Sequence, residues 1–205
     1  MEIACLDLEG VLVPEIWIKF AEKTGISELR ATTRDIPDYD ELMTMRLSIL
    51  AKHGLGLQQI QEVIATLSPL DGAAEFLDWL RARFQVVILS DTFYEFAGPL
   101  MAQLGYPTLL CHKLTVDEKG MATEYNLRQV NPKRQAVCAC KTLYYRTIAV
   151  GDSYNDTTML AEADVGILFH APDNVIAQFP QFPSVQTFAA LKHEFLKSSL
   201  RELPL

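Results

Sequence analysis

Two carboxylates, Asp7 and Glu9, stand directly behind the short apolar stretch Ile3–Leu6. In an extended chain alternate side chains point to the same side, so residues two apart leave the end of a strand together. A carboxylate pair of this kind can bind a metal ion or carry out acid–base chemistry. Acidic residues also occur in ordinary turns and helix caps, so this pair alone does not decide between the possibilities.

Two further polar clusters follow apolar stretches in the same way. The pair Ser90-Asp91 comes after Val86–Leu89, and the run Gly151–Asp156 comes after Ile148–Val150. Each cluster alone is compatible with a helix N-cap, where Ser, Asp and Asn are preferred. Three such clusters, together with Lys133 at a predicted helix start, are hard to attribute to chance.

The apolar stretches are predicted to be strands of a parallel sheet. Short runs rich in Val, Ile and Leu alternate with helical patterns, which is typical of α/β proteins. Ligands of open parallel sheets bind beyond the carboxyl ends of the strands, so the polar clusters are expected to meet there. The predicted strands are Ile3–Leu6, Val86–Leu89, Ile148–Val150 and Val165–Phe169.

Two other elements are predicted within this core. Leu109–Leu114 and Thr115–Asn126, with a polar centre at residues 117–120, indicate a β-hairpin or flap. The apolar spacing in Asp71–Arg83 predicts a helix, with Asp71 as its N-cap.

Residues 15–70 fit the alternation badly, because they contain helical patterns but no convincing strand. These patterns are Ile16–Lys23, Tyr39–His53 and Gln58–Thr66. We therefore predict a helical cap over residues 15–70, inserted after the first strand, and a core made of residues 1–14 and 71–205.

The composition is that of a compact globular protein, with 49% hydrophobic and 21% charged residues among 205. A net charge of −8 argues against nucleic acid or an anionic membrane as a partner. The chain begins with a strand-like run and no apolar stretch reaches 18 residues, so we expect a cytoplasmic protein. The cysteines lack a CxxC pair and are predicted to be reduced thiols: Cys5, Cys111, Cys138 and Cys140.

In their order along the chain, these clusters resemble the motifs of the haloacid dehalogenase superfamily. The matching residues are Asp7–Val11, Ser90, Lys133 and Gly151–Asp156, so the resemblance spans nearly the whole chain. It implies a Rossmann-like parallel-sheet core with a helical cap inserted after the first strand.

Within the superfamily, a cap of this size that carries Glu15 and Arg46 is similar to that of the phosphoserine phosphatases. The resemblance implies that Arg46 binds the carboxylate of an amino acid phosphate and Glu15 its ammonium group. The most similar type is bifunctional, a phosphoserine phosphatase and homoserine phosphotransferase. We therefore expect hydrolysis of O-phospho-L-serine to L-serine and phosphate, and transfer of the phosphoryl group to L-homoserine.

The chemistry of phosphoryl transfer indicates a role for each motif residue. Asp7 would attack phosphorus and form an aspartyl phosphate, while Glu9 would act first as general acid and then as general base. Ser90 and Lys133 would hydrogen-bond the phosphoryl oxygens. Mg2+ would be held by Asp7, the backbone carbonyl of Glu9 and Asp152.

Two further predictions concern the third cluster: Asn155 binds substrate and Asp156 orients Lys133.

Two positions depart from the superfamily pattern. Glu9 replaces an aspartate, and Asp91-Thr92, with Asp91 counted among the substrate-binding residues, replaces glycines. The longer Glu9 moves its carboxyl by up to about 1.5 Å. We infer that the altered pocket handles water less well as the acceptor of the phosphoryl group. The aspartyl phosphate would then stay available to another alcohol, such as homoserine.

Other possibilities stay open. A phosphatase of another small phosphate ester, or a non-catalytic phosphoserine-binding module, would carry the same motifs. A carbon–halogen dehalogenase would need neither the metal nor the second acid, so Glu9 and Asp152 argue against it. A homodimer formed through exposed cap or flap surfaces is also left open. The four scattered histidines receive no role.

Overall fold

A seven-stranded sheet forms the centre of the molecule in the computed structural model, which describes residues 1–32, 35–36 and 38–201. The strand order is β4-β3-β2-β1-β5-β6-β7, and every pair is parallel except the antiparallel hairpin β3–β4. The strands are β1 (Glu2–Leu6), β2 (Gln85–Phe93), β3 (Leu109–Val116), β4 (Ala122–Asn126), β5 (Arg146–Gly151), β6 (Val165–Phe169) and β7 (Ser184–Val185).

Helices connect these strands and cover the sheet. In chain order they are α1 (Ile16–Thr24), η1 (Ser27–Arg30), α2 (Tyr39–Lys52), α3 (Leu57–Ile64), α4 (Ala73–Arg81), α5 (Tyr94–Gln103), α6 (Pro132–Thr142), η2 (Tyr154–Asp156), α7 (Thr157–Glu162), α8 (Asp173–Gln178) and α9 (Phe188–Ser198). The predicted α/β fold with helices after the first strand is confirmed.

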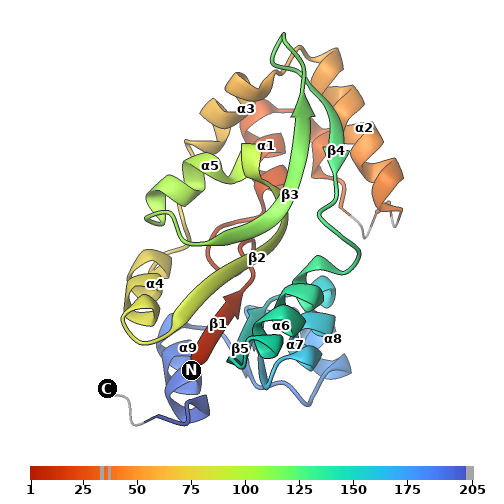
Figure 1. Cartoon of the computed structure of the whole chain (residues 1–205). Coiled ribbons are helices and arrows are strands. Elements are labelled where there is room, and N and C mark those ends of the chain that lie inside the picture. The colour runs from red at the N-terminus through yellow and green to blue at the C-terminus, as the bar shows by residue number, and fades with distance from the viewer. Residues whose placement is uncertain (33–34, 37, 202–205) are drawn as a thin grey trace.

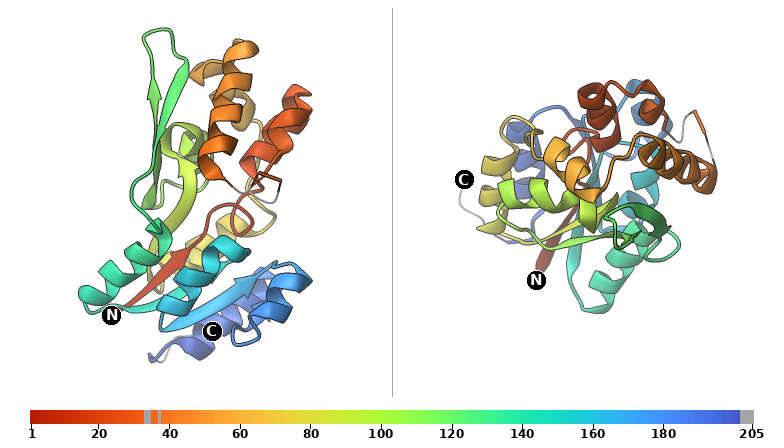
Figure 2. Two further views of the ribbon diagram at one scale, coloured as in Figure 1. Left: turned by 90° about the vertical axis from the view of Figure 1, so that its right-hand side faces the viewer. Right: turned by 90° about the horizontal axis from the view of Figure 1, so that it is seen from above.

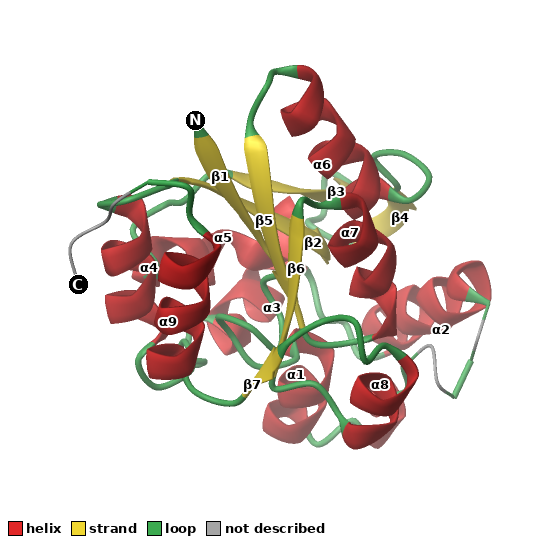
Figure 3. Ribbon diagram, turned by 90° about the horizontal axis from the view of Figure 1, so that it is seen from below, coloured by secondary structure: helices red, strands yellow, loops and turns green. Residues whose placement is uncertain are grey.

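The side chains of each strand alternate between two hydrophobic layers. On β1, Ala4 and Leu6 belong to the larger buried cluster, whereas Cys5 belongs to the smaller one. Helices α4 and α9 lie over the first face of the sheet, and α6 and α7 lie over the second (Figure 3). Because both faces are buried, the strands are nearly continuous apolar runs, which is how the sequence revealed them.

Helices α1, α2 and α3 lie beyond the carboxyl end of the sheet, beside the long hairpin β3–β4 (Figures 1 and 2). The Tyr125 hydroxyl on β4 donates a hydrogen bond to Asp40, and its ring meets Tyr39 edge-on at 5.7 Å. The Leu57 amide at the start of α3 donates to the Gly120 carbonyl at 2.7 Å. A core hairpin therefore supports the helices inserted after β1; the cap boundary at residues 15–70 stays a prediction.

One local prediction was wrong. The N-cap of α4 is Gly72, not Asp71, and Gly72 takes a left-handed conformation with φ 83°. This turn leads the chain into the helix without a side-chain cap, so Asp71 stays exposed. None of the helices in the described ranges is long and apolar enough to cross a membrane.

Candidate active site

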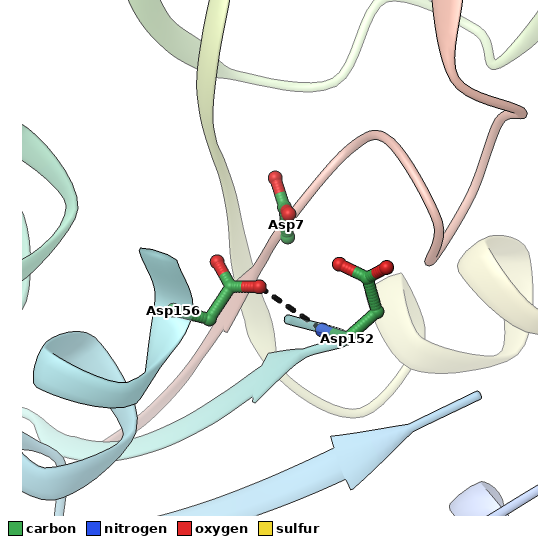
Figure 4. A group of neighbouring side chains, drawn as sticks. All are labelled: Asp7, Asp152 and Asp156. Atoms are coloured by element: carbon green, nitrogen blue, oxygen red, sulfur yellow. Dashed lines mark hydrogen bonds between the residues drawn. The ribbon is translucent and has the colours of Figure 1, made fainter. Parts of the chain in front are cut away.

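Three carboxylates meet where β1 and β5 end (Figure 4). Asp7 extends β1 by one residue, because its amide donates to the Val150 carbonyl of β5 at 2.9 Å. Asp152 and Asp156 follow β5 directly. Asp7, Asp152 and Asp156 each offer an oxygen, and these oxygens lie within 4.8 Å of one another. The structure thus brings the first and third sequence clusters together beside β1, where the strand order reverses.

The close approach of the two loops requires glycine at position 10. Gly10 has φ +76°, and a Cβ atom there would lie 2.3 Å from Asp152 Oδ2. No side chain fits at such a distance, and the left-handed conformation also disfavours other residues. The glycine in the Asp7–Val11 motif therefore makes room for the carboxylate of Asp152.

The ammonium group of Lys133 lies among the carboxylates. Pro132 begins α6, and Lys133 in its first turn is buried. Its Nζ is 2.8 Å from Asp156 Oδ1, 3.0 Å from Asp7 Oδ1 and 3.4 Å from Asp91 Oδ2. Burial lowers the pKa of Lys133, but Asp156, Asp7 and Asp91 outweigh it and hold the pKa well above its ordinary value. Lys133 is therefore a buried cation.

Asp156 uses both carboxylate oxygens within the protein. Oδ1 accepts from Lys133, and Oδ2 accepts from the backbone N–H groups of Asp152 at 3.0 Å and Ser153 at 3.2 Å. Its side chain is fully buried. The arrangement fits the predicted orienting role and leaves Asp7 and Asp152 to face a ligand.

The charge balance of this cluster fits a divalent cation. Burial, and then Asp156, raise the pKa of Asp7 well above its ordinary value, against the lowering effect of Lys133. Burial, Asp156 and Glu15 raise the pKa of Asp152 to about 7. One lysine therefore does not neutralise the group. Carboxylate oxygens are the ligands that hard cations such as Mg2+ prefer, so the donor set suits such an ion.

Glu9 has the environment of a proton donor. It is half-buried, and its Oε2 accepts from the Ile16 N–H at the start of α1, at 2.9 Å. Burial and the neighbouring Glu15 raise the pKa of Glu9 to about 8, although the Ile16 N–H opposes the shift. At neutral pH the carboxyl is therefore largely protonated. Glu15 itself is exposed at the N-cap of α1.

The second sequence cluster lies on the other side of Lys133. Ser90 is buried near the end of β2, and its Oγ accepts from the Thr92 N–H at 3.2 Å. Asp91 Oδ2 accepts from Asn155 Nδ2 at 3.0 Å. Asp91 thus connects the second cluster to Lys133, and through Asn155 to the third.

No sequence motif indicates the contact between Asp91 and His112. His112 is buried on β3, and its Nε2 lies 3.6 Å from Asp91 Oδ1. Burial raises the pKa of Asp91, but Lys133, His112 and Asn155 together lower it by more. The pKa of Asp91 therefore lies well below its ordinary value. Asp91 is therefore a carboxylate held by three partners from three elements.

Arg46 lies apart from this group, on α2. It is buried, and its guanidinium carbon lies 4.4 Å from the Trp17 ring centre. Nη2 donates to the Ala31 carbonyl at 2.8 Å, while Nε has no hydrogen-bond partner. Within the described ranges no carboxylate lies within 4.0 Å of Arg46, so it forms no ion pair with Asp38 or Glu41 near the start of its own helix.

An arrangement of this kind suits phosphoryl transfer. It combines the carboxyl group of Asp7, a protonated acid at Glu9 and a fixed positive charge at Lys133. Such a transfer demands positioning and charge neutralisation more than elaborate covalent chemistry. The site provides both on strand and helix ends.

Comparisons with known proteins agree with this geometry. The family described as haloacid dehalogenase-like hydrolase matches residues 1–164. The chain is 73% identical over 205 residues to phosphoserine phosphatase ThrH of Pseudomonas aeruginosa, with all of both chains covered. It is also 73% identical over 205 residues to the phosphoserine phosphatase of Pseudomonas syringae pv. tomato, covering all of this chain and 86% of that protein.

A solved structure is similar over the same extent. The crystal structure of a phosphoserine phosphatase in apo form superposes with a TM-score of 0.75 at 20% identity, over 96% of this chain and 98% of that chain. At this identity the likeness concerns the fold. The family match over most of the chain and the relatives matched from end to end confirm the resemblance stated from the motifs: the chain belongs to the haloacid dehalogenase-like hydrolases.

Proposed function

We propose that the protein hydrolyses O-phospho-L-serine to L-serine and phosphate through an aspartyl phosphate on Asp7, and that it also transfers the phosphoryl group to L-homoserine. The names of the two relatives at 73% identity support the first activity. The acidic cluster with one buried lysine supports the covalent route.

Arg46 is the observation that carries the substrate class. A buried guanidinium without a carboxylate partner is costly, and burial lowers the pKa of Arg46 to about 10. A substrate carboxylate would restore the missing charge and give Nε an acceptor. Glu15, at the start of α1, would take the ammonium group. These two residues would select an amino acid phosphate over a simple phosphate ester.

The roles of the remaining residues follow from their surroundings. Asp7 Oδ attacks phosphorus, while the protonated Glu9 gives its proton to the departing serine oxygen. Glu9 then removes a proton from the incoming water or alcohol. Ser90 and Lys133 donate to the phosphoryl oxygens, and Asn155 with Asp91 borders the substrate. Mg2+ bound by Asp7, Asp152 and the Glu9 carbonyl would neutralise phosphate charge.

The experiment is a product balance. Purified protein with Mg2+ and O-phospho-L-serine is incubated with and without L-homoserine, and phosphate and O-phosphohomoserine are measured together. Asp7→Asn provides the blank. We expect Asp7-dependent phosphate release, and O-phosphohomoserine formed at its expense when homoserine is present.

The other outcomes are equally informative. Equal phosphate release with and without homoserine would remove the transferase activity from the proposal. Stoichiometric binding of phosphoserine without either product would indicate a binding module instead.

A further inference from the structure

Asp91 contacts Lys133, and His112 contacts Asp91 from behind, in an arrangement for which the proposed chemistry gives His112 no role. We propose that Asp91 and His112 form a positioning pair, in which His112 fixes the Asp91 carboxylate and Asp91 fixes the direction of the Lys133 ammonium group. The inference rests on the proposed phosphoryl transfer but not on the identity of the substrate.

The ammonium group of Lys133 has three N–H donors and three carboxylate neighbours. Asp156 and Asp7 are almost completely buried, with 0% and 5% of their side chains exposed, whereas 35% of the Asp91 side chain is exposed. The first two carboxylates hold the lysine from inside the protein. Asp91 holds it from the open side, so it limits the directions in which the third N–H can point.

Asp91 is itself held in place. Its Oδ2 accepts from Asn155 at 3.0 Å and lies 3.4 Å from Lys133, so Oδ1 is left for His112. The His112 Nε2 approaches Oδ1 at 3.6 Å, which is longer than a hydrogen bond but close enough for the N–H dipole to face the carboxylate. The carboxylate plane is therefore determined from both ends.

The backbone fixes the tautomer of His112. Its Nδ1 accepts from the Arg128 N–H at 3.0 Å, so the ring proton resides on Nε2 and points toward Asp91. The ring is 3% exposed and packs against Phe93, with 6.2 Å between the ring centres. His112 is thus oriented by β3 and by the loop that follows β4, not by the substrate pocket.

This geometry predicts that turnover and phosphate affinity respond differently to the loss of Asp91, whereas a general loss of structure would lower both. Removing the Asp91 charge takes a negative group away from the phosphate site, so it cannot weaken the electrostatic attraction for bound phosphate. It does release Lys133 from its third partner, and a misplacement of about 1 Å can cost about 10²-fold in rate. Turnover should therefore fall while phosphate affinity is kept.

The experiment compares three variants of the full chain with Mg2+. Asp91→Asn keeps the shape and removes the charge. His112→Gln keeps a donor near the Nε2 position, whereas His112→Asn keeps only the acceptor near Nδ1. Steady-state constants are measured for O-phospho-L-serine and for p-nitrophenyl phosphate, and the dissociation constant of inorganic phosphate is measured by calorimetry. Cys111→Ala, a neighbouring truncation on β3, is the control.

We expect Asp91→Asn and His112→Asn to lose about 10- to 100-fold in kcat on both substrates, with phosphate affinity unchanged or tighter. His112→Gln should keep most of the parent kcat, and Cys111→Ala should have the same kcat as the parent chain. Equal losses in both His112 variants, or phosphate affinity falling in step with kcat, would overturn the inference. If the parent chain hydrolyses p-nitrophenyl phosphate alone, the proposed substrate fails while this comparison still stands.

Discussion

Two corners of the site differ in how their charges are satisfied. The first consists of Lys133 with Asp7, Asp91 and Asp156, and the second consists of Arg46 with Trp17. Around Lys133, every carboxylate already has a partner from the protein, and the positions come from strand and helix ends. Around Arg46, a buried guanidinium contacts Trp17, the Ala31 carbonyl and the Met43 sulfur. The carboxylates of the first corner are held in place by the protein itself. The guanidinium of the second has no carboxylate within 4.0 Å among the described residues.

From this difference we infer that the two corners divide the work of rate enhancement and substrate selection. A preorganised group of charges stabilises the reaction whatever the leaving group is. An unpaired buried cation discriminates instead, because a substrate that lacks a carboxylate leaves it unsatisfied. Substitutions in the first corner should therefore lower the rate for all substrates, and substitutions in the second should affect one class of substrate.

The largest effect is expected for Lys133→Met. It removes the one cation that contacts Asp7, Asp91 and Asp156 among the described residues, so kcat should fall about 10³-fold for O-phospho-L-serine and p-nitrophenyl phosphate alike. Steady-state kinetics on both substrates measure this. The control is Lys141→Met, since Lys141 near the end of α6 pairs with Glu162 on the surface, away from the acidic cluster. A loss of kcat confined to one substrate would contradict the proposed division of work between the two corners.

The next effect tests the fit between the two loops. Gly10→Ala should displace the Asp152 carboxylate and lower kcat about 10²-fold, with a higher Mg2+ requirement. Gly25→Ala is the matched control, because Gly25 also has a positive φ but no neighbour within 4 Å of the added Cβ. It should cost about 1 kcal/mol of stability and leave the rate unchanged. Similar rates in the two variants would show that the loop contact is dispensable.

A more selective change is expected for Arg46→Met. The KM for O-phospho-L-serine should rise about 10- to 100-fold, as for a lost hydrogen-bonded charge pair, while p-nitrophenyl phosphate is hydrolysed within about threefold of the parent rate. Arg30→Met, at an exposed pair with Glu22, serves as control. If hydrolysis of both substrates is impaired equally, Arg46 supports the fold of the cap and does not determine substrate specificity.

The smallest effect is a pH dependence. The pKa of Glu9 is raised to about 8, so the protonated acid is abundant below that pH and falls about tenfold for each unit above it. The kcat/KM for O-phospho-L-serine should decline accordingly between pH 8 and 10. With p-nitrophenyl phosphate, whose leaving group needs no proton, that decline should be absent. A decline of equal steepness on both substrates would assign the ionisation to another group.

Much of the first corner could be predicted from the sequence, because it depends on strand ends. Asp7, Ser90 and Asp152 each follow an apolar run, and parallel strands bring such ends to one edge. Lys133 was found from its place at a helix start. These signals are local in the sequence and need no knowledge of how distant segments pair.

The contact between His112 and Asp91 could not be predicted, because it depends on strand register. The pairing of β2 with β3 shifts between Leu89 and Phe93, which puts Phe93 opposite His112. Nothing in a single sequence encodes that shift. The wrong prediction of Asp71 as the N-cap residue of α4 has a similar origin, since the left-handed turn at Gly72 decides where α4 begins. The short strand β7 and helix α9 also lay outside the predicted elements.

The hairpin β3–β4 lies beside the helices inserted after β1 (Figure 1) and adds a support to their two peptide connections with the core. This brace consists of the hydrogen bonds of Tyr125 and Gly120, and α5 adds a further contact, because the Gln61 side chain donates to the Glu95 carbonyl. A cap held in this way cannot swing like a lid unless the brace moves with it or its bonds break. Hydrogen exchange at the Leu57 amide, which the Gly120 carbonyl protects, would therefore report each opening that releases the brace.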